Sequence, residues 1–318
     1  MKPIKILIPY RMKGIRIDAA LSEMLPNYSR SKISAFIKSK NILLNKKPFK
    51  PKDKIYGNEI ITFEKNQTAI TNWIPEKIPL NIIFEDSHII VINKPFGLVT
   101  HPGAGNWSGT LANALLYYDS ELSKLDRSGI VHRLDKNTSG LMVVAKNSMS
   151  QKHLIEQLQS HSIQREYSAI VYGNMISGGT VNEPIGRDSK DRIKQAIKSN
   201  GKDSVTHYRV IDRFASHTHV KAILETGRTH QIRVHLSHIG YPLIGDFMYG
   251  GRLRFPKKAS EELKDALKSF SRQALHSKKL TLIHPETSNL MTWKIELPDD
   301  MSNLLSVLSS FDSIMTRE

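Results

Sequence analysis

The sequence of 318 residues contains no cysteine. A chain without cysteine has no disulfide framework, no thiolate ligand for a metal and no thiol nucleophile. It also has no apolar run near the roughly 20 residues that a membrane span needs, and its first residues lack the apolar segment of a secretory signal peptide. These absences exclude thiol chemistry, and we expect a soluble, cytoplasmic protein.

The common nucleotide-binding and hydrolase motifs are also missing. There is no Gly-x-x-x-x-Gly-Lys-Ser/Thr loop, no Gly-x-Gly-x-x-Gly run and no Gly-x-Ser-x-Gly elbow. The densest histidine group is His230, His235 and His238, but its segment also carries Arg228 and Arg233, whose charges oppose a bound dication. We therefore expect no metal and no cofactor, which leaves chemistry performed by a carboxylate.

Acidic residues are scarce, because 30 Asp and Glu stand against 46 Lys and Arg and give a formal net charge of +16. Such a balance indicates an acidic partner, and nucleic acid is the usual one. The charge is uneven: residues 1–66 hold 15 Lys or Arg and 5 Asp or Glu, a net of +10, and the rest of the chain nets only +6. A general lysine bias would explain the abundance of lysine but not this concentration.

The pattern along the chain predicts two domains joined by a linker. Residues 1–66 contain two stretches of helical periodicity, the second one capped by Ser29, and then two short strands around a lysine-rich turn. Residues 67–79 are polar and contain two prolines, which is typical of a linker. We expect phosphate contacts from the basic residues of the second helix, which are Arg30, Lys32, Lys38 and Lys40.

Residues 80–318 mix strand-like and helix-like segments without a regular βαβ alternation. This predicts an α+β domain with a mixed, largely antiparallel sheet flanked by helices. Helices are expected to begin near Thr110, at Thr229 and after Pro256. The basic loop over residues 187–202 offers a second phosphate-binding surface through Arg187, Arg192 and Lys194. Either basic group could instead be an ordinary solvated surface.

The run GIVHRLDKNTSG, residues 129–140, places the carboxylate of Asp135 inside this basic protein. An aspartate in such a run can simply form an Asx turn. However, polar neighbours such as His132 and Arg133 surround it, and an apolar strand-like run, Leu141–Ala145, follows at once. Loops at the ends of strands commonly display reactive groups. The residues alone leave open whether Asp135 forms a turn or performs catalysis.

The extended run GIVHRLDKNTSGLMVVAK resembles the signature of the pseudouridine synthases that modify large-subunit ribosomal RNA and some transfer RNAs. Supporting segments follow the order of that family: INKPFGLVTHPG, REYSAIVYG, LETGRTHQIRVHLSHIGYPLIGDFMYGG and RQALHSKKLTLIHP. The N-terminal part resembles the S4 (αL) RNA-binding module. The resemblance implies an S4-like domain over residues 1–66 and a pseudouridine synthase catalytic domain over residues 80–318.

The resemblance also implies roles for five residues. Asp135 matches the nucleophile that releases uracil from N1 so that it rejoins through C5, and Arg228 matches the arginine paired with that aspartate. Tyr167 matches the tyrosine that stacks on the uracil and is a candidate to remove the C5 proton. Arg133 matches the arginine that enters the stack when the uridine swings out, and Ile244 matches an apolar pocket floor. From the residues alone, Arg228 could instead bind a phosphate and Tyr167 could belong to the core.

The implied activity is a cofactor-free isomerisation of uridine to pseudouridine in 23S rRNA, with the helix 69 loop as the expected substrate. The implied partner is the large ribosomal subunit or its assembly precursor. A non-catalytic rRNA-binding assembly factor is an alternative, and a glycosidase that leaves abasic products is another. We expect a monomer without membrane contact, because no apolar stripe requires a partner subunit.

Overall fold

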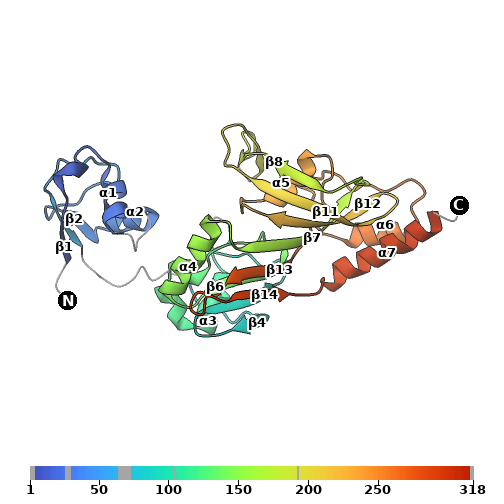
Figure 1. Cartoon of the computed structure of the whole chain (residues 1–318), viewed down its shortest axis with the longest axis horizontal. Helices are drawn as coiled ribbons and strands as arrows, with labels where there is room; N and C mark the ends of the chain where they lie inside the picture. Colours follow the sequence, from blue (N-terminus) through green and yellow to red (C-terminus); the bar gives the residue numbers. More distant parts are fainter. Residues whose placement is uncertain (1–3, 26–29, 64–72, 104, 192, 316–318) are drawn as a thin grey trace. The chain divides into compact units, whose positions relative to one another are not determined.

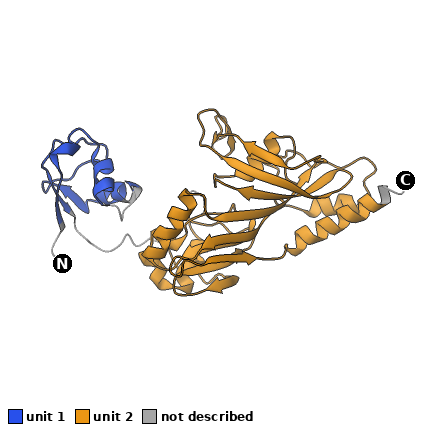
Figure 2. Ribbon diagram, viewed as in Figure 1, with its two compact units in different colours: residues 1–70 blue, residues 71–318 orange. Residues whose placement is uncertain are grey.

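The computed structural model describes residues 4–25, 30–63, 73–103, 105–191 and 193–315. The chain forms two compact units, residues 1–70 and residues 71–318 (Figure 1, Figure 2). The division between them falls within the segment for which the sequence predicts a linker. The second half of that segment nevertheless belongs to the second unit: the Asn113 side chain donates a hydrogen bond to the carbonyl of Ile74, and Trp73 packs against the core.

The first unit packs two helices on a three-stranded antiparallel sheet of order β1-β3-β2. Its elements are β1 (Ile4–Leu7), α1 (Ile17–Met24), α2 (Arg30–Lys38), β2 (Ile42–Leu44) and β3 (Ile60–Phe63). Both predicted helices and both predicted strands are present. The sequence did not reveal β1, because this strand of four residues is defined by its pairing with β3, far along the chain. The predicted cap, Ser29, lies outside the described residues.

The second unit is built on a nine-stranded sheet of order β4-β5-β6-β13-β7-β12-β11-β8, with β14 paired to β13. Only β6 and β13 run parallel among the described pairs, so the predicted mixed, largely antiparallel sheet is confirmed. A separate two-stranded hairpin stands beside it. The strands are β4 (Ile82–Glu85), β5 (Ile89–Lys94), β6 (Ser139–Ala145), β7 (Gln164–Tyr172), β8 (Gly179–Asn182), β9 (Ile185–Arg187), β10 (Gln195–Ile197), β11 (Val205–Arg213), β12 (His217–Leu224), β13 (Leu275–Ile283) and β14 (Leu290–Lys294).

The helices that flank this sheet are α3 (Leu111–Tyr118), α4 (Ser148–Gln159), α5 (Gln231–His238), α6 (Glu261–Ser269) and α7 (Asp299–Met315). As predicted, α3 begins after Thr110, which forms a reciprocal capping box with Asn113. The prediction that Thr229 caps α5 is wrong. The residue before α5 is His230, whose backbone is left-handed (φ 58°, ψ 20°). The helix after Pro256 starts only beyond Ser260, whose side chain accepts the amide hydrogen of Leu263.

The sheet has an apolar core on both faces, and β6 shows how the sequence produces it. Every residue of β6 is buried. Met142 and Val144 join the cluster around α3 and α5, whereas Leu141 and Val143 join the cluster beneath α4. Successive side chains of a strand point to opposite faces, so a strand covered on both faces reads as one continuous apolar run. Among the described residues, no helix is both long and apolar enough to cross a membrane.

Candidate active site

The loop that carries Asp135 is bounded by two glycines that pack directly against backbone. A Cβ on Gly129 would lie 2.0 Å from the carbonyl oxygen of Ala145, and a Cβ on Gly140 would lie 2.3 Å from that of Ser277. Both glycines also have positive φ angles, +78° and +116°, which L side chains rarely adopt. The two ends of the loop are therefore held tightly against the central sheet.

Hydrogen bonds hold the loop between these ends. The Thr100 hydroxyl donates to the carbonyl of Leu134 at 2.8 Å, and the amide of Val143 donates to Nε2 of His132 at 3.0 Å. Burial lowers the pKa of His132 to about 3, so the ring is neutral at pH 7 and can accept this bond. We conclude that His132 positions the loop and is too weak a base for proton transfer at neutral pH.

Lys94, at the end of β5, is buried beneath the same loop and is only 1% exposed. Its Nζ donates to the carbonyls of Pro95 and Leu98, both at 2.8 Å, and of Lys136 at 3.2 Å. Burial lowers the pKa of Lys94 to about 7, and the charge of Asp135 opposes that shift. Three acceptors use all three hydrogens of an ammonium group, so the geometry fits the charged lysine and fixes the backbone next to Asp135.

Asp135 is held through one of its two carboxylate oxygens. Nη1 of Arg233 donates to Oδ2 at 3.1 Å, while Nε and Nη2 of Arg233 donate to the two oxygens of Asp246 at 2.7 and 2.9 Å. Burial lowers the pKa of Arg233, but both carboxylates raise it more, so the guanidinium remains charged. No described residue donates to Oδ1 of Asp135. One oxygen is therefore oriented by Arg233, and the other has no donor among the described residues.

The prediction that Arg228 pairs with Asp135 is wrong. The side chain of Arg228 is exposed, and its Nε donates to the backbone carbonyl of Asp203 at 3.1 Å. Arg228 precedes α5 and its amide is tied to the side chain of Gln231 at 3.0 Å. Arg233 lies in the first turns of α5 and faces the loop instead. From the sequence, Arg233 is identified only as a positive charge that opposes a bound metal ion, and not as the partner of Asp135.

Sequence reasoning also missed two neighbours of this ion pair, His230 and Tyr249. Nε2 of His230 lies 3.8 Å from Oδ2 of Asp135, and its Nδ1 is 2.7 Å from the hydroxyl of Tyr249. The ring of Tyr249 lies beneath the guanidinium of Arg233, with 4.9 Å between the guanidinium carbon and the ring centroid. His230 was considered only as a possible metal ligand. The run GDFMYGG gave no local signal for Tyr249, because its contacts depend on the fold.

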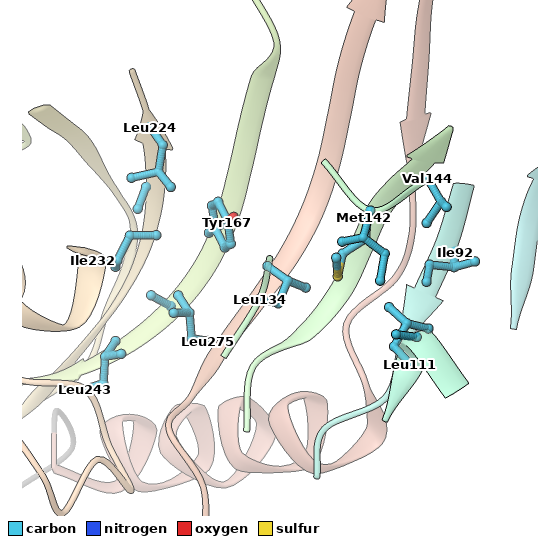
Figure 3. Close-up of a cluster of buried hydrophobic side chains, with 14 of the residues drawn as sticks. Ile92, Leu111, Leu134, Met142, Val144, Tyr167, Leu224, Ile232, Leu243 and Leu275 are labelled. Carbon is cyan, nitrogen blue, oxygen red and sulfur yellow. The ribbon is translucent and has the colours of Figure 1, made fainter. Parts of the chain in front are cut away.

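A cavity of about 580 Å³ opens above Asp135, a volume that suits a small ligand or a single extruded nucleotide. Tyr167 of β7 lines it and is 5% exposed. Figure 3 shows Tyr167 among Leu134, Leu224 and Leu275, which line the same cavity. Burial raises the pKa of Tyr167, although Arg165 and a hydrogen bond with Ser277 oppose the shift, so the phenol is neutral at pH 7.

The prediction that Ile244 forms the floor of the cavity is wrong. Ile244 is fully buried in a separate cluster with Phe270 and Ala274. Its amide donates to the carbonyl of Ile170, which lies on the face of β7 opposite to Tyr167. The apolar wall of the cavity comes instead from Leu134, Leu224, Ile232 and Leu275.

The cavity is strongly basic. Among the described residues that line it, Asp135 is the one carboxylate, and the five arginines are Arg127, Arg133, Arg165, Arg228 and Arg233. Arg133 is exposed at its rim. Arg165 is 5% exposed, and no described residue accepts a hydrogen bond from its Nε. A cavity with this charge favours a polyanionic ligand.

The two predicted phosphate-binding surfaces are partly described. Arg30 donates to the carboxylate of Asp18 at 2.9 Å, and Arg16 reaches the same carboxylate. Lys38, Lys40 and Arg187 are exposed, and Lys194 is half-buried. Arg192 and the side chain of Lys32 lie outside the described part of the chain. Phosphate binding by these residues remains a prediction.

His235 of α5 is engaged in other contacts. Nδ1 of His235 is 2.9 Å from the hydroxyl of Thr206, and its Nε2 is 3.0 Å from the carbonyl of Glu183. Within the described ranges, no group of three His, Cys, Asp or Glu side chains is placed to hold a metal ion.

Several known proteins are similar to this chain. Residues 88–238 match the RNA pseudouridylate synthase family. The chain is 50% identical over 298 residues to ribosomal large subunit pseudouridine synthase D of Yersinia pestis, covering 93% of this chain and 92% of that protein. It is 49% identical over 296 residues to the protein of the same name from Escherichia coli K12, covering 93% and 91%. Human RNA pseudouridylate synthase domain containing 4 has a solved structure with a TM-score of 0.56 and 27% identity, which covers 72% of this chain and 93% of that one. The chain belongs to the RNA pseudouridylate synthase family.

Proposed function

We propose that this enzyme converts uridine to pseudouridine in the RNA of the large ribosomal subunit. The observation that carries the proposal is Asp135, the one carboxylate described in an arginine-lined cavity, with Oδ2 held by Arg233 and Oδ1 free. The relatives named ribosomal large subunit pseudouridine synthase D support the choice of ribosomal RNA. We expect the helix 69 loop of 23S rRNA as the substrate, either in free RNA or in an assembling subunit.

The chemistry proceeds by nucleophilic catalysis at Oδ1 of Asp135, without a metal or cofactor. The carboxylate adds to the nucleotide while the bond between N1 of uracil and C1′ of ribose breaks. The free uracil turns, and C5 forms a bond with C1′ as the carboxylate of Asp135 is released. The C5 proton passes to solvent and N1 takes up a proton, so that the product is an isomer of uridine. Arg233 orients the carboxylate beside the phosphates of the RNA, because its planar guanidinium holds its N–H donors in fixed directions.

The target uridine must leave the RNA stack before Asp135 can reach it. We assign to Tyr167 the stacking of the extruded uracil, since its ring lines the cavity. Stacking on an aromatic ring is worth about 1–3 kcal/mol, which offsets part of an extrusion cost of a few kcal/mol. Arg133, exposed at the rim, fills the gap that the uridine leaves.

RNA is gathered by the basic surfaces around the site. Arg228, which is exposed at the cavity and free of Asp135, is reassigned to a phosphate contact. The N-terminal unit serves as an S4-like RNA-binding domain, with phosphate contacts assigned to Arg30, Lys32, Lys38 and Lys40. A second set of phosphate contacts is assigned to Arg187, Arg192 and Lys194. A single-stranded loop suits this mode of recognition, because splayed bases are easier to extract than paired ones. The enzyme acts as a cytoplasmic monomer.

The test incubates the purified full chain with a helix 69 transcript and maps pseudouridine by carbodiimide adducts and primer extension. We expect new stops with the wild type and none with Asp135→Ala, while both proteins bind the RNA equally. Binding without stops in either protein would favour the alternative of a non-catalytic assembly factor. Abasic products would indicate a glycosidase.

A further inference from the structure

Tyr249 contacts both groups that stand beside Asp135. Its hydroxyl is 2.7 Å from Nδ1 of His230, and its ring lies under the guanidinium of Arg233 at 4.9 Å. The rings of His230 and Tyr249 meet edge to face, with 5.6 Å between centroids. A third contact leads away from the site: the backbone amide of Gln195, on β10, donates to the Tyr249 hydroxyl at 2.9 Å.

These contacts determine where the protons lie. The phenol oxygen accepts the amide hydrogen of Gln195 and has one hydrogen of its own to donate. Burial raises the pKa of Tyr249 to about 12, so that hydrogen is present at pH 7. The acceptor available to it is Nδ1 of His230, and a neutral imidazole that accepts at Nδ1 carries its proton on Nε2. The Nε2–H of His230 then faces Oδ2 of Asp135, 3.8 Å away.

We infer that Tyr249 is a positioning residue, which presents Arg233 and the Nε2–H of His230 to Oδ2 of Asp135 and connects this arrangement to the β9–β10 hairpin. The inference deepens the proposed function and rests on it. Tyr249 does not touch the reacting atoms. Its role is to keep Oδ2 occupied, so that Oδ1 is the oxygen that attacks the nucleotide.

The backbone of His230 supports this assignment. His230 adopts a left-handed conformation immediately before α5, which is uncommon for a residue with a side chain. Strained backbone of this kind persists where surrounding contacts fix it, and it gathers at functional sites. Here the conformation turns the ring toward both Tyr249 and Asp135.

The link to the hairpin gives the RNA a route to the catalytic carboxylate. Gln195 begins β10, and β10 pairs with β9, which carries the exposed Arg187 of the second basic surface. RNA that docks on this hairpin contacts the same element as the Gln195 amide that donates to Tyr249. If the hairpin were misplaced, the Tyr249 hydroxyl would lose the amide of Gln195 and no longer fix the tautomer of His230.

The charged and titratable groups that face His230 are Asp135, Asp246, Arg133, Arg233 and Tyr249. Burial lowers the pKa of His230 and the two carboxylates raise it, while the arginines lower it. A hydrogen bond from Tyr249 to Nδ1 stabilises the neutral ring. Loss of the hydroxyl therefore raises the pKa of His230, and a protonated His230 would then bind Asp135 at higher pH than in the wild type.

The test compares Tyr249→Phe, which keeps the ring under Arg233, with Tyr117→Phe, an exposed tyrosine of α3. Single-turnover rates of pseudouridine formation are measured across pH with enzyme in excess. We expect Tyr249→Phe to be about 10-fold to 100-fold slower, with its acid limb moved to higher pH, unchanged RNA affinity and an unchanged melting temperature. Tyr117→Phe should match the wild type.

A double-mutant cycle with His230→Gln separates positioning from mere packing. If Tyr249 acts through His230, adding Tyr249→Phe to His230→Gln should cost little more than His230→Gln alone. Independent, multiplicative losses would overturn the inference, as would a Tyr249→Phe enzyme with the wild-type rate and pH profile. A wild-type protein that forms no pseudouridine would instead overturn the proposed function.

Discussion

Replacement of Arg233 by lysine tests the central ion pair of the site. Lysine keeps the positive charge but has one nitrogen, so it cannot span both oxygens of Asp246 and also reach Oδ2 of Asp135. Arg233→Gln would remove the charge altogether and leave the carboxylate of Asp246, 1% exposed, without its partner. Breaking a buried pair in that way costs about 3–5 kcal/mol, so the glutamine variant could fail to fold, and lysine is the sharper choice.

The expected loss follows from the contact between Nη1 of Arg233 and Asp135. A hydrogen bond between charged groups is worth about 1.5–3 kcal/mol, and about 1.4 kcal/mol corresponds to a tenfold rate change. We therefore expect Arg233→Lys to slow the chemical step about 10-fold to 100-fold. The matched control is Arg228→Lys, whose arginine donates to a backbone carbonyl and lies outside the ion pair. Its chemical step should stay within about threefold of the wild type.

The assay is single-turnover pseudouridine formation on a helix 69 transcript with saturating enzyme, so that changes in RNA binding do not affect the rate. Circular dichroism and thermal melting first establish that both variants are folded. A slow Arg228→Lys enzyme beside an unimpaired Arg233→Lys enzyme would refute the reasoning, because it would restore Arg228 as the partner of Asp135.

Three further outcomes are expected. Lys94→Met leaves the carbonyls of Pro95, Leu98 and Lys136 without their donor. Because an unsatisfied buried group costs about 1–3 kcal/mol, urea unfolding should show a free energy of unfolding lower by at least about 2 kcal/mol. An unchanged free energy would mean that Lys94 does not hold the loop. Ile244→Val should lower the free energy of unfolding by about 0.5–1.5 kcal/mol without changing the single-turnover rate, because Ile244 lies in a separate cluster. A slower reaction would indicate that Ile244 lines the cavity after all. Burial lowers the pKa of His132 to about 3 in the folded state, so the unfolded chain takes up this proton first. The contribution of His132 to the free energy of unfolding is complete above about pH 6.5 and should fall by about 1.4 kcal/mol per pH unit as the solution is acidified toward pH 4. Urea unfolding of His132→Gln should show a weaker dependence on pH, and an identical dependence would contradict the assignment.

Local sequence patterns predicted the elements that local forces define. The predictions of β6 from its continuous apolar run and of the start of α3 from Thr110 are both confirmed. Burial on both faces and helix capping each depend on residue types within a few positions. Family motifs placed Asp135 in the loop between Gly129 and Gly140. The structure adds the reason for both glycines, which is backbone contact with β6 and β13 that no spacing reveals.

The partner of Asp135 was missed because it depends on the start of a helix. Arg228 and Arg233 lie five residues apart in one basic segment, and both could reach a loop almost a hundred residues earlier. The left-handed backbone of His230 decides between them by starting α5 after it, which turns Arg233 toward Asp135 and leaves Arg228 outside. Asp246 and Tyr249 join the site through tertiary contacts alone.

The free oxygen of Asp135 is central to the proposed reaction. The most direct measurement is the release of tritium from C5 of uridine in a helix 69 transcript, with the wild type compared with Asp135→Asn, which preserves the size of the side chain. We predict rapid release with the wild type and none above background with Asp135→Asn, while both proteins bind the RNA with equal affinity. Tritium release by a folded Asp135→Asn enzyme at a rate near that of the wild type would contradict this prediction.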